Sequence, residues 1–303
     1  MLHNDHSLFE QVVLRVSEDA GIEASIVEKD YYVTLFLRRI VAQLPNIIFK
    51  GGTSLSKCYK LINRFSEDID LNIETETHPT EGQRKKLKEV IVSVIDEFGF
   101  TLSNPDQVRS RRDYNRYIVD YPTIFPVSYL KEHLIVETAV YIKAYPCKRM
   151  LASSLIYDYL ERNGYEDLIE QYGLQPFELN VQAAERTLVD KVFALGDYYL
   201  SDAVHEHSRH VYDIYKLLDI VTLDGSLKDL AQSVREERKP HVNCRSAKDG
   251  VVMNTLLQEI VDKAIYEPDF NEITAKMLFE EVTYETSVTA LRKIIESGIF
   301  SCD

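Results

Sequence analysis

Apolar residues in the first hundred positions recur with the period of helices. The stretch SLFEQVVLRVSEDAG has the three- and four-residue spacing of an amphipathic helix, which we expect to end near Gly21. The stretch SIVEKDYYVTLFLRRIVAQL predicts a second, longer helix, and the spacing of Ser25 and Glu28 predicts a capping box at its first turn. The same helical period returns between Thr80 and Phe98.

Strand-like segments separate these helices. The segments NIIFK, EDIDLNI, RYIVDY and HLIVETAVYIK are short, apolar or alternating, and rich in residues that favour strands. A helix-like segment, TSLSKCYKLI, follows directly on Gly51 and Gly52. Strands and helices mixed in this order predict a small mixed sheet and the α+β class.

The character of the chain changes near Pro146. From there on, most segments have helical periodicity and only FELNV has the pattern of a strand. We therefore predict two domains: residues 1–145 hold the mixed sheet, and residues 146–303 are mainly helical. No Gly/Ser-rich linker separates them, so we expect the two halves to pack tightly.

Composition narrows the classes of function. The chain has 303 residues and a formal net charge of −14, which opposes coating of nucleic acid by bulk electrostatics. Two basic islands, RKKLK at 84–88 and RSRRDYNR at 109–116, interrupt the acidic chain. No apolar run has the length of a membrane span, and the first residues lack the pattern of a signal peptide. Four cysteines without a C-x-x-C pair favour a reducing cytoplasm over a zinc ribbon or a disulfide framework.

Two carboxylates share one face of the strand predicted after the glycines. Asp68 and Asp70 point to the same side of that strand, while the intervening Ile69 faces the core. Such carboxylates repel each other unless a cation lies between them, and Mg²⁺ takes one or two protein carboxylates together with substrate phosphates. A D-x-D pattern is also common in turns, so its position after a Gly-Gly turn matters: there the backbone approaches a ligand closely and N–H groups attract phosphate.

Charged residues in apolar segments give further candidates. Glu137 lies within HLIVETAVYI, where a carboxylate is costly unless it is paired, bound to metal or at a half-exposed edge. Lys191 falls on the edge of the apolar stripe of a helix, so its ammonium either extends to water or enters a cleft to meet phosphate oxygens. Arg209 and Asp213 are four residues apart, which fits an ion pair along a helix or an aspartate that orients Lys191 or a ribose hydroxyl.

Three histidines crowd into the segment HEHSRH just before that pair. His205, His207 and His210 lack the cysteines and the fourth ligand that a structural zinc site has. We therefore predict the metal ligands among the carboxylates.

Four blocks of the sequence resemble the AbiEii-type toxins of the polymerase-beta-like nucleotidyltransferase superfamily. They are VEKDYYV, FKGGTSLSKCYKLINRFSEDIDL, ERTLVDKVFAL and SRHVYDIYKL, in this order between residues 27 and 218. The superfamily pattern is a glycine-hydroxyl pair, a D-x-D on a strand and a third carboxylate on a later strand. Gly52 and Thr53 match the first part, and the D-x-D at 68–70 matches the second, although the gap between them is slightly longer than is typical. No strong local motif fixes Glu137 as the third carboxylate. The lysine and the later aspartate of the family fall on Lys191 and Asp213.

The resemblance implies a nucleotidyltransferase that uses Mg²⁺ or Mn²⁺ and moves a nucleotide from an NTP to an acceptor, expected to be RNA, with tRNA as one candidate. It also implies a cytoplasmic toxin of an abortive-infection, phage-defence pair, with a cognate antitoxin protein as partner. Residues 1–145 would then be the nucleotidyltransferase core, and residues 146–303 a helical domain that completes the active-site cleft. The predicted catalytic residues are Asp68, Asp70, Lys191 and Asp213; the predicted metal ligands are Asp68, Asp70 and Glu137; the predicted nucleotide-binding residues are Gly51, Gly52, Thr53, Ser54, Lys191 and Arg209.

Two alternatives stay open from the sequence. One is a small-molecule nucleotidyltransferase, which a closed pocket would favour and a broad basic surface would oppose. The other is a catalytically silent module that binds a partner protein, which the intact Asp68, Asp70 and Lys191 oppose. For an RNA acceptor we expect a local basic track with aromatic residues that stack on bases. Its members would be Arg109, Arg111, Arg112, Tyr114, Arg116 and Tyr117.

Overall fold

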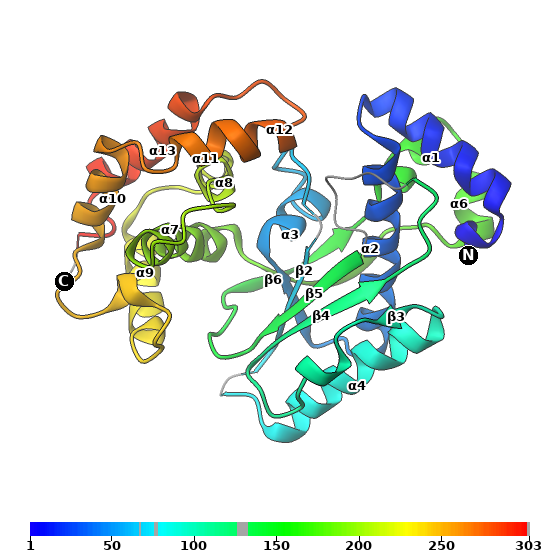
Figure 1. Ribbon diagram of the computed structural model, residues 1–303, viewed down its shortest axis with the longest axis horizontal. Helices are drawn as coiled ribbons and strands as arrows, with labels where there is room; N and C mark the ends of the chain where they lie inside the picture. The colour runs from blue at the N-terminus through cyan, green and yellow to red at the C-terminus, as the bar shows by residue number, and fades with distance from the viewer. Residues whose placement is uncertain (67, 76–77, 126–132, 302–303) are drawn as a thin grey trace. The chain divides into compact units, whose positions relative to one another are not determined.

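The computed structural model describes residues 1–66, 68–75, 78–125 and 133–301 (Figure 1). The chain divides into two compact units. The sheet unit comprises Met1–Tyr59 and Ser66–Val181, and the helical unit comprises Lys60–Phe65 and Gln182–Asp303. Glu67, the first residue of the predicted strand EDIDLNI, and Cys302, one of the four cysteines, lie outside the described residues.

The sheet unit is built on a mixed sheet that has seven strands within the described residues, in the order β3-β4-β5-β2-β1-β7-β6. Strands β2 and β5 pair in parallel, as do β1 and β7, whereas β1–β2, β3–β4 and β4–β5 are antiparallel. The α+β prediction is confirmed. The bounds are β1 Ile47–Lys50, β2 Asp68–Ile73, β3 Thr101–Leu102, β4 Tyr114–Asp120, β5 His133–Ala139, β6 Cys147–Ala152 and β7 Phe177–Gln182.

Helices bury the apolar face of this sheet. Helix α2 packs against β2 and β5, and α4 packs against α2 and β3 (Figure 1). Helix α1 ends where the sequence predicts, because Gly21 adopts the left-handed conformation that closes a helix. The bounds are α1 His6–Ala20, α2 Ala24–Gln43, α3 Gly51–Lys57, α4 Glu81–Glu97, α5 Leu155–Arg162 and α6 Glu166–Tyr172.

The capping box predicted for α2 is wrong. The N-cap residue is Glu23, and Ser25 lies inside the first turn. Glu28 is fully buried and accepts hydrogen bonds from the Thr123 hydroxyl (2.6 Å) and from the backbone N–H groups of Ile124 (2.8 Å) and Phe125 (3.1 Å). The S-x-x-E spacing is a local signal, whereas Glu28 bonds a loop almost a hundred residues further along the chain.

The boundary between the units differs from the expected position between residues 145 and 146. Strand β7 continues the sheet, because Ile48 and Phe49 of β1 pair in parallel with Asn180 and Val181. Strand β6 was not among the predicted strands; it lies at the edge of the sheet, and its sequence CKRMLA has no strict alternation of apolar and polar residues. The helix predicted over residues 53–62 is shorter than expected, because α3 ends at Lys57, and the segment Lys60–Phe65 belongs to the helical unit.

The helical unit packs around α7 and α8. Helix α7 contacts α8, α9 and α10, and α8 also contacts α13. Gly196 of α7 allows close packing, since a Cβ there would lie within 3 Å of Ser246, Met253 and Leu256. The bounds are α7 Ala184–Leu200, α8 Arg209–Leu217, α9 Gly225–Arg238, α10 Met253–Asp262, α11 Glu267–Asp269, α12 Ala275–Met277 and α13 Tyr284–Ser297.

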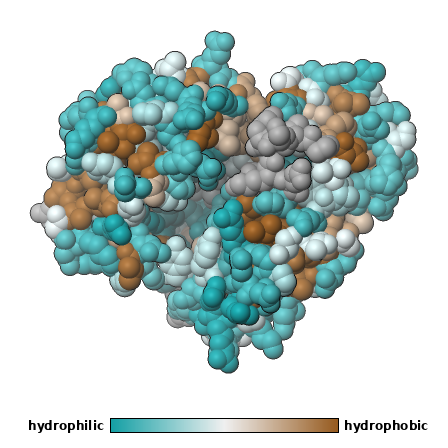
Figure 2. All heavy atoms as spheres, viewed as in Figure 1, coloured by the Kyte–Doolittle hydropathy of each residue, from teal (hydrophilic) through white to brown (hydrophobic). Residues whose placement is uncertain are grey.

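The surface agrees with the acidic, polar composition. Figure 2 shows mostly hydrophilic residues on one face, with hydrophobic residues in separate groups. Among the described residues, no helix combines the length and the apolar character needed to span a membrane.

Candidate active site

Four charged residues form one row across the middle of the sheet. Lys50 of β1 pairs with Asp70 of β2. Asp70 pairs with Glu137 of β5, and Glu137 pairs with Arg116 of β4. Residues paired across strands point to the same face of a sheet, so two carboxylates lie between two cations. Ile69 points to the opposite, fully buried face, as the alternation predicts.

Asp70 lies directly against the turn that begins α3. Gly51 has φ of +78°, a conformation that favours glycine. A Cβ at this position would lie 2.0 Å from Oδ2 of Asp70, which is closer than any real contact. The Gly-Gly turn and the D-x-D strand are therefore matched: glycine at position 51 makes room for the carboxylate.

Asp68 lies on the same face of β2 as Asp70. Its Oδ1 is buried and has no hydrogen-bond partner among the described residues. A buried carboxylate oxygen without a partner is costly, and a hard divalent cation would satisfy it with an ion–oxygen bond. Carboxylate oxygens on one face of a strand are donors that fit Mg²⁺ or Mn²⁺.

Glu137 is already paired inside the sheet unit. The Tyr114 hydroxyl donates to its Oε1 at 2.9 Å, and Arg116 Nε lies 3.6 Å from the same atom. Burial, together with the Glu137 charge, raises the pKa of Tyr114, so this hydroxyl stays a donor. No three His, Cys, Asp or Glu side chains of the described residues are grouped closely enough to hold a metal ion. Glu137 as the third metal ligand stays a prediction.

The hydroxyl groups after the glycines bond within the protein. Thr53 and Ser54 are buried. The Thr53 hydroxyl lies 2.9 Å from that of Ser66, and the Ser54 hydroxyl donates to the Gly51 carbonyl at 2.8 Å. What this turn offers to a phosphate is therefore the backbone N–H groups of the first turn of α3, which lack partners within the helix.

Lys191, Asp213 and Arg64 form a buried cluster in the helical unit. Lys191 Nζ donates to Asp213 Oδ2 at 2.6 Å, so Asp213 orients Lys191 as one of the alternatives predicted. Lys191 is only 5% exposed, and the alternative in which its ammonium extends to water is wrong. Arg64 binds the same carboxylate with two hydrogen bonds, each of 2.7 Å.

The cluster carries more positive than negative charge. Burial alone would raise the pKa of Asp213, but the charges of Arg64 and Lys191 outweigh it and hold that pKa well below its usual value. Burial lowers the pKa of Lys191; Asp213 opposes this shift, and the charges of Arg64 and Arg209 add to it. Two buried cations thus share one carboxylate.

The ion pair of Arg209 with Asp213, one of the alternatives predicted, does not form among the described residues; Arg64 and Lys191 bind this carboxylate instead. Arg209 acts at longer range and adds positive charge near Lys191. His210 Nδ1 lies 3.4 Å from Lys191 Nζ, and its ring is stacked parallel to that of Tyr198. Burial and the Lys191 charge lower the pKa of His210 well below its usual value, so its ring is neutral at neutral pH.

Arg64 is the residue of this cluster that the sequence analysis missed. It lies between the glycine turn and the D-x-D, just after the helix predicted over residues 53–62 and before the predicted strand, where no element was expected. Its partner Asp213 is 149 residues further along the chain. The only local signal was an arginine four residues before Asp68.

The predicted basic track lies in the sheet unit around β4. Arg111 pairs with Glu81 at 2.7 Å, and both side chains are exposed. Arg112 donates to the Gln107 carbonyl at 3.2 Å. The prediction that Tyr117 stacks on a base is wrong, because this side chain is only 1% exposed and lies on the core side of β4. Tyr114 is 44% exposed.

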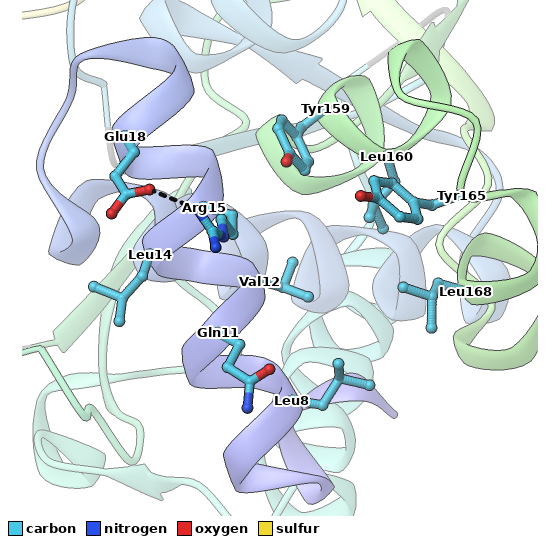
Figure 3. A pocket seen from close by; sticks show the side chains of 10 residues that line it. All are labelled: Leu8, Gln11, Val12, Leu14, Arg15, Glu18, Tyr159, Leu160, Tyr165 and Leu168. Carbon is cyan, nitrogen blue, oxygen red and sulfur yellow. Dashed lines mark hydrogen bonds and ion pairs between the residues drawn. The ribbon is translucent and has the colours of Figure 1, made fainter.

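A cavity of about 540 Å³ lies apart from these residues, between α1 and the helices α5 and α6 (Figure 3). Apolar side chains such as Leu8, Val12 and Leu168 line it, together with Tyr159 and Tyr165. None of the predicted site residues is among its lining residues.

A carboxylate pair on a mixed sheet, next to a Gly-Gly turn, fits the pattern of a nucleotidyltransferase. The family model described as "Nucleotidyl transferase AbiEii toxin, Type IV TA system" matches residues 35–294. The chain belongs to this family, and it is a nucleotidyltransferase toxin; the resemblance predicted from the four sequence blocks is confirmed.

Two solved structures are similar to the chain. MenT4, a nucleotidyltransferase toxin from Mycobacterium tuberculosis, aligns with a TM-score of 0.54 and 17% identity, over 96% of this chain and 90% of that chain. JHP933 from Helicobacter pylori aligns with a TM-score of 0.44 and 17% identity, over 89% of this chain and 90% of that chain. No curated protein matches the sequence. The likeness to MenT4 supports the fold.

Proposed function

We propose that this toxin transfers a nucleotide from an NTP to RNA, with a divalent cation held by Asp68 and Asp70. The carboxylate pair carries the proposal. Asp68 has a buried oxygen without a partner among the described residues, and the Asp70 carboxylate is held against Gly51. When bound, Mg²⁺ or Mn²⁺ would neutralise charge that develops on the phosphoryl oxygens.

The remaining residues of the sheet unit have supporting roles in this proposal. Glu137 is the proposed third ligand, and it would exchange its contacts with Tyr114 and Arg116 for the cation. The backbone N–H groups of Gly51 and Gly52 would receive phosphate oxygens. With Thr53 and Ser54 bonded inside the protein, their hydroxyls support the turn.

Lys191 supplies positive charge to the phosphates in this proposal. Arg64 alone would balance Asp213, and so the Lys191 ammonium is in excess within a buried cluster. A buried cation in excess is costly unless it meets an anion, and a nucleotide brings one. Asp213 orients the ammonium, and Arg209 adds positive charge nearby.

RNA is the proposed acceptor because the basic track borders the carboxylate row. Arg116 belongs to that row, and Arg111 and Arg112 precede it on the same connection. Exposed Tyr114 offers a ring for an unpaired base. We propose that the reaction takes place in the cytoplasm, on tRNA or another RNA.

The family adds a biological role to this chemistry. A family described as a type IV toxin–antitoxin system implies a cognate antitoxin protein, which we propose as the partner that limits toxicity. We propose abortive infection, a defence against phage, as the setting.

The experiment is a transfer assay with purified protein. Each of the four labelled NTPs is incubated with total RNA, with purified tRNA or with a panel of small hydroxylated acceptors, in Mg²⁺ or in EDTA. We expect label on RNA only when Mg²⁺ is present. Label on small molecules alone would support the small-molecule alternative, and no transfer from any NTP would contradict the proposal.

A further inference from the structure

The guanidinium of Arg64 is the most completely bonded group of the helical unit's charged cluster. Nε and Nη2 donate to the two oxygens of Asp213, each at 2.7 Å, and Nη1 donates to the Phe65 carbonyl at 2.8 Å. Arg64 is 4% exposed and Asp213 is fully buried. A bidentate arginine–carboxylate pair of this kind fixes the plane of the carboxylate as well as its position.

The fixed carboxylate then determines where Lys191 lies. Oδ2 of Asp213 accepts from both Arg64 Nη2 and Lys191 Nζ, at 2.7 and 2.6 Å. The bidentate pair with Arg64 defines the plane of the Asp213 carboxylate. The direction of the remaining lone pair on Oδ2 is therefore defined too, and the Lys191 ammonium lies along this direction. An ammonium paired with a freely rotating carboxylate would have no such fixed position.

Groups other than this guanidinium also anchor the segment around Arg64. The Tyr212 hydroxyl is 2.9 Å from the Asn63 backbone nitrogen, which donates to it, and the Asn63 carbonyl accepts from Phe279 at 2.9 Å. The backbone N–H of Phe65 donates to the Met277 carbonyl at 3.0 Å. The segment is therefore held on both sides of Arg64 by other groups, which leaves the side chain of Arg64 to act on the carboxylate.

We propose that Arg64 is a positioning residue for nucleotidyl transfer: it fixes the Asp213 carboxylate, which in turn holds the Lys191 ammonium in the place where it meets the phosphates. This inference rests on the proposed function of Lys191. Lysine cannot replace arginine in this role, because an ammonium is a single point charge and cannot form two parallel hydrogen bonds in the plane of the carboxylate.

The experiment compares Arg64→Lys with Arg238→Lys. Arg238 is a second buried arginine of the helical unit, paired with Asp197 at 2.6 Å and packed over the Phe193 ring, and it has no contact with Lys191 among the described interactions. We expect Arg64→Lys to lower kcat for transfer about 100-fold, as a small misplacement of a reacting group does. KM for the NTP should change less than about twofold, because the lost interaction stabilises the transition state rather than the bound NTP. Arg238→Lys should leave both constants within about threefold of the wild type.

A second measurement does not depend on activity. Acetic anhydride labels lysines, and mass spectrometry gives the labelling of Lys191 relative to Lys57, a buried lysine of the sheet unit paired with Asp30. We expect this ratio to rise in Arg64→Lys and to stay at the wild-type value in Arg238→Lys, since only the first variant frees the ammonium.

Each outcome decides the inference. Wild-type kcat in Arg64→Lys, an equal loss of kcat in both variants, or an unchanged labelling ratio would overturn it. If Arg64→Lys does not fold where Arg238→Lys does, Arg64 acts on stability and the inference is rejected. If the wild type transfers no nucleotide, the proposed function fails, and the labelling ratio still tests whether Arg64 positions Lys191.

Discussion

The two units hold carboxylates under opposite conditions. In the sheet unit, Asp68 has a buried oxygen without a partner among the described residues, and Asp70 lies at the same register as Glu137. In the helical unit, Asp213 has both oxygens occupied by Arg64 and Lys191. The first arrangement gains from an added cation, whereas the second already holds more positive than negative charge. We therefore expect Asp68 to contribute to transfer while it lowers the stability of the protein without metal. We expect Asp213 to contribute to both transfer and stability.

The largest expected effect is the loss of transfer in Asp68→Ala. A metal ion supplies several kcal/mol of transition-state stabilisation, which corresponds to about a 10³-fold decrease in kcat. The thermal midpoint of the protein without metal should stay the same or rise, because the variant removes from beside Asp70 a carboxylate whose buried Oδ1 has no partner among the described residues. Asp120→Ala is the control, since Asp120 is an exposed carboxylate of the same sheet, bonded to Ser103. Full activity in Asp68→Ala would reject the metal site.

Asp213→Ala should have the opposite effect on stability. It leaves two buried cations without their carboxylate, which costs about 3–5 kcal/mol of unfolding free energy. Urea denaturation of this variant beside Asp219→Ala, which removes an exposed aspartate, measures the difference. Equal midpoints for Asp213→Ala and the wild type would contradict the paired cluster.

The difference in unfolding free energy between the wild type and Asp213→Ala should depend on pH. The pKa of Asp213 is lower in the folded than in the unfolded protein, so its contribution is complete above the unfolded value of about 3.9. It is lost as the pH falls through the folded pKa, and the gap between the wild type and Asp213→Ala should narrow on strong acidification. A gap that widened below pH 4 would mean that Asp213 is not held ionised.

The two groups of carboxylates also show which parts of the fold and of the site could be predicted from the sequence. The D-x-D face and most helices follow from short-range periods, so their prediction needed only neighbouring residues. Glu28 looked like a helix cap but bonds residues 123–125, and Arg64 looked unremarkable but binds Asp213. The sheet extends to β7 because of parallel pairing with β1. Partners so distant along the chain leave no periodic signal, and β6, whose sequence CKRMLA does not alternate between apolar and polar residues, gave none either.

Gly51→Ala would sharpen the comparison within the sheet unit. A Cβ at this position meets Oδ2 of Asp70 at 2.0 Å and is also strained at φ of +78°. Gly21→Ala is a matched control, because Gly21 has φ of +66° and a Cβ there would meet nothing within 4 Å. Both variants should lose about 1–2 kcal/mol of stability from the left-handed backbone. Only Gly51→Ala should lower kcat, by about 100-fold, because only it displaces a carboxylate of the site.

If Gly51→Ala and Gly21→Ala retained equal activity, the contact with Asp70 would have no role in transfer. Thermal denaturation and the transfer assay on the same preparations separate the two effects. A loss of activity in Gly21→Ala as large as in Gly51→Ala would assign both losses to stability.

The smallest expected effect concerns RNA binding by the basic track. Arg111 and Arg112 are exposed, and their partners, Glu81 and the Gln107 carbonyl, are surface groups whose loss costs little stability. Each arginine that contacts phosphate of a single strand contributes about 0.7 to the slope of log K against log salt concentration. Replacing both with alanine should therefore reduce that slope by about 1.4 and weaken RNA binding at low salt, while NTP binding stays unchanged because the carboxylates and the Gly-Gly turn supply it.

The control removes two other exposed arginines of the same unit, Arg15 and Arg162, which pair with Glu18 and Asp19. Both double variants lose the same formal charge, so a change that depends only on net charge would appear equally in the two. RNA affinity measured across a salt series, beside NTP affinity at one salt concentration, separates the cases. A reduced slope in the Arg111/Arg112 variant alone would place the RNA beside β4. Equal slopes in the two variants would show that the RNA follows another surface, and the carboxylate row would then act without this track.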